Sequence, residues 1–246
     1  MKNIIVLLLT LSLSNVFAQL DSKDSAYVTN FIALLVKNDT HALASKTRYP
    51  LERPYPLSSI KDSAEFVLRF NELFDQNNVR AIVASNPKED WSHFGWRGIS
   101  LQSEQIWLDE DGWFKGGCYF TEKATKKAKK ILLHDRQSVH PSLREFENPV
   151  LLWSSESYTI RIDQTKKGYR YASWSKGKKL SDKPDLILFG THDYSGSGGY
   201  RDFNFISGIY KYNVGDSAVG PNVGDLTVYK NDVEILSQSC YEIELK

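Results

Sequence analysis

Four tryptophans lie between positions 90 and 113 of the chain, together with Asp90 and His93. An imidazole near a carboxylate can act as an acid–base pair, and Asp90 and His93 have that chemistry. Aromatic side chains on a concave sheet bind apolar ligands or sugars, although they also fill cores. We assign no catalytic residue. The sequence predicts a ligand-binding site made of Trp91, His93, Trp96, Trp107 and Trp113.

A second polar cluster lies between Thr191 and Tyr200, where serines, a histidine and an acid are mixed with glycines. A serine hydrolase of the Gly-x-Ser-x-Gly type is not indicated, because Asp193 stands two residues before Ser195 and Ser195 two residues before Ser197. Glycine-rich polar stretches form exposed loops, which often contact partners. We predict a partner-binding loop in which Ser195, Ser197 and Tyr200 make the contacts.

Sequence motifs for metals and cofactors are missing. The five histidines form no His-Glu-x-x-His pattern, and the two cysteines form no Cys-x-x-Cys. Gly196 and Gly198 do not begin a dinucleotide fingerprint, because Arg201 stands where its third glycine belongs. Asp109 to Gly112 lacks the later glutamate of a calcium loop and favours a hairpin turn. We expect no metal and no cofactor.

The first eighteen residues have the pattern of a cleavable secretory signal peptide. Lys2 precedes the apolar run Ile4 to Leu13, which is shorter than the roughly 20 residues of a membrane-spanning helix. Ala18 is a small residue suited to cleavage, and Gln19 stands where a lipoprotein would carry its lipid-modified cysteine. We expect cleavage after Ala18 and a periplasmic or secreted protein without a lipid anchor or a further membrane span.

The charge balance restricts the class of partner, and the two cysteines allow one disulfide. Lys and Arg number 31 against 30 Asp and Glu, and this balance argues against nucleic acid as a partner. The expected partner is a small molecule or an envelope protein. In an oxidising compartment Cys118 and Cys240 could form one disulfide between the two halves of the chain, or they could remain buried thiols.

Residues 19–120 are predicted to form helices followed by strands. Apolar spacing indicates a helix over 25–36 and another from Asp62, its cap, to Phe74. Strands are predicted at 98–101, 105–108 and 113–120.

Together with Tyr49-Pro50-Leu51 and Ile106-Trp107-Leu108, this order of elements resembles secreted members of the NTF2-like family. The resemblance implies a cone-shaped α+β fold, in which a curved antiparallel sheet wraps over the helices. It also implies a pocket at the mouth of the cone, which some members of the family use for catalysis and others for binding.

Residues 121–145 are predicted to form a lysine-rich helical connector, and residues 146–246 are predicted to form an antiparallel β domain. The alternation in 158–162 and the hairpin signal at 230–233 predict a small all-β barrel or sandwich. Segments such as 169–174 resemble blocks of uncharacterised secreted bacterial proteins. This resemblance implies no activity. The lysines of the connector are interpreted as a solvated helix face.

These features predict an α+β protein that acts as a non-catalytic binding or accessory module. Two alternatives remain open. The stretch from Ser197 to Tyr200 is similar to the Ser-Gly loop that bacterial periplasmic inhibitors insert into lysozyme, which implies an inhibitor of an envelope-directed hydrolase. The other alternative is an NTF2-like enzyme that uses Asp90 and His93 as acid–base residues in the cone pocket.

Overall fold

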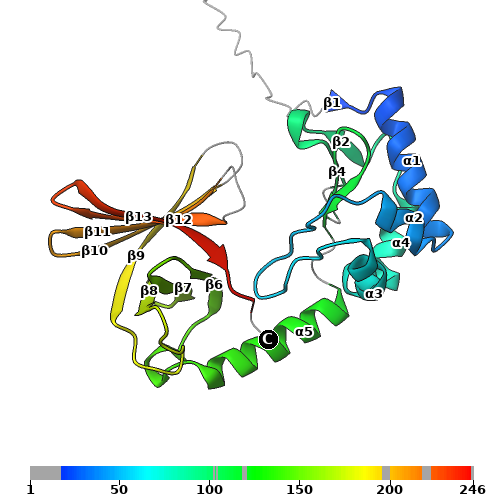
Figure 1. Ribbon diagram of the computed structural model, residues 1–246. Coiled ribbons are helices and arrows are strands. Elements are labelled where there is room, and N and C mark those ends of the chain that lie inside the picture. The colour runs from blue at the N-terminus through cyan, green and yellow to red at the C-terminus, as the bar shows by residue number, and fades with distance from the viewer. Residues whose placement is uncertain are drawn as a thin grey trace, which may run out of the picture. The chain divides into compact units, whose positions relative to one another are not determined.

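The computed structural model describes residues 18–101, 103, 105–117, 121–195, 200–217 and 223–244 (Figure 1). The chain divides into two compact units. The first comprises Met1–Leu51 and Lys61–Cys118, and the second comprises Glu52–Ile60 and Tyr119–Lys246. Glu52–Ile60 therefore belongs to the second unit, an assignment that the sequence pattern does not predict. Among the described residues, no helix is long and apolar enough to span a membrane.

The first unit contains four helices, each preceded by an aspartate cap. These helices are α1 (Ser22–Val36), α2 (Thr40–Ser45), α3 (Ser63–Leu73) and α4 (Gln76–Ala84). The caps Asp21, Asp39, Asp62 and Asp75 accept hydrogen bonds from backbone N–H groups of the first turn, which stabilises a helix start. The predicted cap Asp62 is confirmed, since it accepts from the Glu65 amide at 2.9 Å.

A five-stranded antiparallel sheet completes the first unit. Its strands, in spatial order, are β1 (Ala18–Gln19), β2 (Trp91–His93), β3 (Ile99–Leu101), β4 (Ile106–Leu108) and β5 (Phe114–Gly116). The predicted turn at Asp109–Gly112 joins β4 to β5, and its Gly112 amide donates to the Asp109 carbonyl at 3.0 Å. The predicted cleavage point after Ala18 lies within β1.

Aromatic rings form the core of the first unit. Phe31 of α1 packs on Phe114 of β5 with ring centroids 5.8 Å apart and on Trp91 of β2 at 6.2 Å. Phe66 and Phe74 of the α3 region also contact Phe114, at 6.4 and 5.4 Å. The apolar face of α3 is therefore buried, and the sheet contributes Trp91 to the same cluster.

The second unit contains a closed barrel of eight antiparallel strands. They are β6 (Asn148–Ser154), β7 (Tyr158–Thr165), β8 (Gly168–Ser175), β9 (Leu186–Ser195), β10 (Tyr200–Ser207), β11 (Tyr210–Asp216), β12 (Gly224–Lys230) and β13 (Val233–Glu242). Of the two predicted architectures, barrel and sandwich, the structure has the barrel. The predicted hairpin between β12 and β13 is confirmed, with Asn231 and Asp232 at φ 49° and 63°.

Strand β13 closes the barrel on β6 over a short distance. Tyr241 pairs with Ser154 and Glu242 with Trp153, and no further pairs are formed between the two strands among the described residues. Inside the barrel, Trp153, Phe203 and Phe205 are buried with aliphatic neighbours, as expected for a small barrel filled by side chains. The sequence pattern predicts two strands, 233–236 and 241–245, where the structure has the single strand β13.

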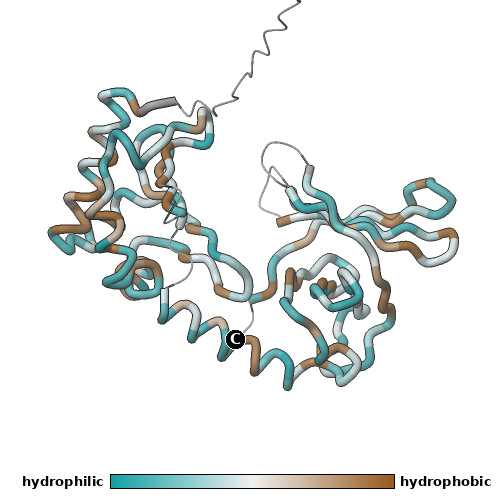
Figure 2. Tube along the Cα trace, turned by 180° about the vertical axis from the view of Figure 1, so that it is seen from behind, coloured by the Kyte–Doolittle hydropathy of each residue, from teal (hydrophilic) through white to brown (hydrophobic). Residues whose placement is uncertain are grey.

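Helix α5 (Glu122–Ser138) and the short helix η3 (Pro141–Leu143) lie in the second unit, and Figure 2 shows α5 as largely hydrophilic. Asp135 on α5 is nevertheless buried. It accepts two hydrogen bonds from Arg161 of β7, at 2.7 and 2.6 Å. A helix that is solvated along most of its length is thus tied to the barrel by one buried charge.

The predicted alternation in β7 places Ile160 and Ile162 in the barrel core, and Arg161 and Asp163 lie on the opposite, outward face. That face is also buried, since Arg161 and Asp163 are both 0% exposed. Arg161 binds Asp163 at 2.9 Å, and Arg170 of β8 binds Asp163 at 2.7 Å. We call Asp135, Arg161, Asp163 and Arg170 the ionic network. Its two cations and two anions compensate one another, as buried charges require.

Candidate functional site

A cavity of about 590 Å³ opens in the barrel unit, and we call it the acidic pocket. Its described lining comes from β6, the start of β10, the end of β11 with the following Ser217, Val223 before β12, the end of β13 and the segment that begins at Glu52. Among the described residues that line it are three carboxylates, Glu52, Asp216 and Glu242, and two guanidinium groups, Arg53 and Arg201. The ionised lining therefore has a negative excess.

Arg201 and Asp216 form a rigid pair on neighbouring strands. The Arg201 side chain donates to Asp216 at 2.9 Å through Nε and at 2.8 Å through Nη2, and its backbone amide donates to the same carboxylate at 2.9 Å. A further bond joins Arg201 Nη1 to the carbonyl of Val150 at 3.4 Å. A bidentate pair of this kind neutralises both charges and fixes their positions.

Glu242, at the end of β13, has no such partner, whereas Glu52 accepts a hydrogen bond from the Ser59 hydroxyl at 2.9 Å. The Glu242 side chain forms no hydrogen bond or salt bridge with any described residue. Burial raises the pKa of Glu242, the nearby charges of Glu52 and Glu244 raise it further, and Arg201 opposes them. Because Glu242 keeps exposed surface at the rim, water screens part of this repulsion.

Aromatic side chains supply the walls of the acidic pocket. Tyr55, Trp153 and Tyr200 line it. Gly224 makes room for the indole, because a Cβ there would come within 2.4 Å of the Trp153 ring. The pKa of Tyr55 is raised well above its usual value, chiefly by burial, and the charges of the ionic network and of Glu242 also act on it.

The arrangement suits the binding of a positive charge better than catalysis. An unpaired carboxylate attracts a cation, and aromatic faces bind cations through their quadrupoles. In the described part of the chain, no group of three or more His, Cys, Asp or Glu residues is placed to hold a metal ion. The acidic pocket is therefore a candidate site for an organic cation.

The predicted tryptophan site is not brought together. Trp91 is 1% exposed, donates from Nε1 to Ser85 Oγ at 2.9 Å and belongs to the core, whereas Trp96 on η1 (Gly95–Arg97) is 64% exposed. Trp107 lies against Phe94, with centroids 5.3 Å apart. The guanidinium of Arg48 lies 4.4 Å from the Trp113 ring centroid. No ring contact joins two of these four tryptophans.

The predicted acid–base pair is also separated. Asp90 accepts a hydrogen bond from the Asn86 amide at 2.6 Å, and His93 Nδ1 lies 2.6 Å from Asp24 of α1 instead. Asp24 is buried on the helix face that carries Val28 and Phe31. A polar residue on an apolar helix stripe needs a buried partner, and that stripe is the sequence signal that could have found Asp24.

The predicted partner loop is described only in part. Tyr200 is 37% exposed and lines the acidic pocket, which gives this candidate residue a definite position. Ser195 ends β9, and its side chain lies outside the described part of the structure, as does all of Ser197. His192 packs between the rings of Tyr169 and Tyr194, at 5.0 and 4.4 Å, so its surroundings are aromatic.

The predicted disulfide stays a prediction. Cys118 lies outside the described residues. Cys240 is buried in the barrel, and its thiol lies 3.7 Å from the Gln238 carbonyl, to which it donates. Burial raises the pKa of this thiol to about 11, which keeps it protonated and unreactive at neutral pH.

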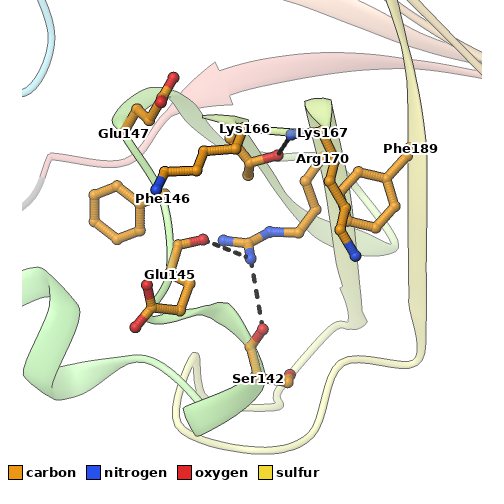
Figure 3. Close-up of a pocket in the computed structure, with 9 residues that line it drawn as sticks. Ser142, Glu145, Phe146, Glu147, Lys166, Lys167, Arg170 and Phe189 are labelled. Atoms are coloured by element: carbon orange, nitrogen blue, oxygen red, sulfur yellow. Dashed lines mark hydrogen bonds between the residues drawn. The ribbon is translucent and has the colours of Figure 1, made fainter.

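A second cavity, of about 350 Å³, is drawn in Figure 3. Its buried cation is Arg170, whose guanidinium points toward Glu145 and Ser142 in this view and donates to the Glu145 carbonyl at 3.1 Å. Arg170 also donates to the Leu143 carbonyl at 2.7 Å, so it joins η3 to the barrel. The lining also contains two lysines, Lys166 and Lys167, and two glutamates, Glu145 and Glu147. We interpret this cavity as part of the packing between η3 and the barrel and not as a ligand site.

Comparisons with protein-family models, curated proteins and solved structures found no match to this chain.

Proposed function

We propose that the protein is a secreted or periplasmic, non-catalytic binding module, and that the acidic pocket holds a positively charged organic group. An ammonium or a guanidinium has the chemistry that suits it. The observation that carries this proposal is the Glu242 carboxylate, which lies at the exposed rim of an aromatic-lined cavity and forms no hydrogen bond or salt bridge with any described residue. We also propose an NTF2-like first unit, supported by helices that precede an antiparallel sheet.

The pocket favours a cation over an anion because its described lining holds three carboxylates against two guanidinium groups. Arg201 already holds Asp216 through several hydrogen bonds, so an incoming anion would have to compete with a fixed carboxylate. A cation would meet Glu242 and nearby Glu52, and it would relieve the repulsion between them. Tyr55 and Tyr200, which keep exposed surface, could cover its apolar part.

Titration of the protein with benzylammonium tests the proposal, with benzyl alcohol and benzoate as neutral and anionic controls. We expect the cation to bind most tightly and Glu242→Gln to weaken it by about tenfold, or about 1.4 kcal/mol. Glu156→Gln, an exposed change outside the pocket, should leave binding unchanged. Calorimetry measures all three ligands on all three proteins. Equal binding of benzoate, or an unaffected Glu242→Gln variant, would contradict the proposal.

The cation affinity should rise with pH. Glu242 is protonated and neutral below its raised pKa, so binding weakens as the pH falls through that value and is restored above it. The same raised pKa means that ionisation of Glu242 costs folding stability as the pH rises from the ordinary glutamate value through the raised one. Glu242→Gln should therefore remove this part of the pH dependence without lowering the melting temperature at neutral pH.

An acid–base activity in the first unit is a second candidate, favoured by the contact between Asp24 and His93. The carboxylate lies 2.6 Å from Nδ1 and can orient the imidazole, which is the arrangement that general bases use. The predicted partner Asp90 is not involved. If a substrate is found, His93→Gln should abolish turnover and leave benzylammonium binding unchanged; retained turnover would exclude this candidate.

A further inference from the structure

A separate cavity of about 360 Å³ in the barrel unit is lined by four tyrosines, Tyr158, Tyr171, Tyr210 and Tyr212. We propose that this cavity, which we call the tyrosine mouth, binds a neutral sugar ring. It shares no lining residue with the acidic pocket, and the inference goes beyond the function proposed above.

The tyrosines reach the mouth from three strands of the barrel. Tyr158 begins β7, Tyr171 lies on β8, and Tyr210 and Tyr212 alternate along β11 so that both face inward. Tyr171 is buried, and its ring lies 5.8 Å from that of Tyr212. The inner tyrosine thus forms the floor, and the three half-buried ones form the rim.

The phenol groups of the rim are available to a ligand. Among the described residues, Tyr158, Tyr210 and Tyr212 form no side-chain hydrogen bond. Their closeness is also visible in the raised pKa of Tyr212, caused first by burial and then by the neighbouring Tyr210 and Tyr158. Three phenols therefore meet at one opening, and each can donate and accept.

A sugar ring matches this combination of surfaces. Its C–H faces can stack on tyrosine rings, and its hydroxyl groups can pair with phenols, which are apolar bodies with a polar end. A purely apolar ligand would cover the phenols without satisfying them, which disfavours it. The cavity lies near the small end of the about 300–1,000 Å³ range of ligand pockets, so it fits a compact ligand.

The charged groups around the tyrosine mouth already have contacts within the protein, which favours a neutral ligand. Asp185 accepts from the amide and the hydroxyl of Ser175 at 2.7 and 2.9 Å and also binds Lys178. Lys230 lies over the Tyr210 ring, 5.8 Å from its centroid. The remaining lining consists mostly of aliphatic residues, among them Leu226 and Leu236.

Saturation-transfer NMR on the whole protein tests the inference, with the methyl glycosides of glucose, galactose, mannose and N-acetylglucosamine as probes. Cyclohexanol and p-cresol serve as ring compounds without the hydroxyl pattern. We expect at least one glycoside to bind, Tyr212→Leu to weaken it at least tenfold, and Tyr212→Phe to weaken it several-fold. Tyr194→Leu, at a 71% exposed ring outside the mouth, should leave binding unchanged.

Tyr158→Phe provides a second, milder change at the rim, and circular dichroism establishes that each variant is folded. If Glu242→Gln leaves glycoside binding unchanged, the glycoside binds outside the acidic pocket. The inference is overturned if no glycoside binds, if only p-cresol or cyclohexanol binds, or if folded Tyr212→Leu binds the glycoside as well as the wild type.

Discussion

Arg161→Met should lower the free energy of unfolding of the barrel unit by about 3–5 kcal/mol, the usual cost of breaking a buried ion pair. Arg161 is 0% exposed and spans two carboxylates, with bonds of 2.7 and 2.6 Å to Asp135 and 2.9 Å to Asp163. Removal of the guanidinium leaves Asp135 buried without compensation. Hydrogen exchange of barrel peptides at increasing urea concentrations measures the change in the free energy of unfolding of the barrel unit.

Two further variants show whether charge compensation is the cause. Arg161→Lys should also be strongly destabilised, because an ammonium cannot bridge two carboxylates in bidentate fashion. The double variant with Asp135→Leu and Arg161→Met should be more stable than Arg161→Met alone, since no orphaned charge remains at 135. Lys166→Ala, at an exposed turn, is the control. A loss below about 1 kcal/mol in Arg161→Met would contradict this role.

Trp91→Ala should cost about 3–5 kcal/mol of stability in the first unit, whereas Trp96→Ala should change it by less than about 0.5 kcal/mol. Trp91 is 1% exposed, packs on Phe31 and holds Ser85 through its indole N–H. Trp96 is 64% exposed. Thermal and urea unfolding of the two variants measure the contrast, with Trp96→Ala as the matched control.

These two variants decide between core and ligand site for the tryptophans. A Trp91→Ala protein with wild-type stability would contradict the core role. If the Trp96→Ala protein kept its full stability but no longer bound a ligand, the predicted role of Trp96 as a binding residue would be supported. Because Trp91 is buried and Trp96 makes no ring contact with the other three tryptophans, we expect neither result.

Local signals in the sequence predict much of the secondary structure. The Asp62 cap, the turn at Asp109–Gly112 and the hairpin at Asn231–Asp232 depend on residues close together in the chain, and all three are present. The α+β class follows from the same kind of pattern. Strand lengths are less well predicted, as β13 shows, because polar residues at 237–239 interrupt the apolar pattern without ending the strand.

Burial that depends on distant segments could not be predicted in the same way. Arg161 alternates with apolar residues and has the pattern of a solvated face, but Asp135, 26 positions earlier, covers it from α5. His93 lies near Asp90 in sequence and pairs with Asp24, 69 positions away. The acidic pocket combines the segment at Glu52 with the end of β13 at Glu242, so no window of sequence contains it.

A carbon NMR titration of the Glu242 carboxyl, with and without saturating benzylammonium, is the decisive test of the acidic pocket. We predict a pKa above the ordinary glutamate value in the free protein, because of burial and the neighbouring Glu52 and Glu244. The bound cation should lower this pKa, since a positive charge nearby favours the ionised carboxylate. An ordinary pKa that does not respond to benzylammonium would contradict the assignment of the acidic pocket as a cation site.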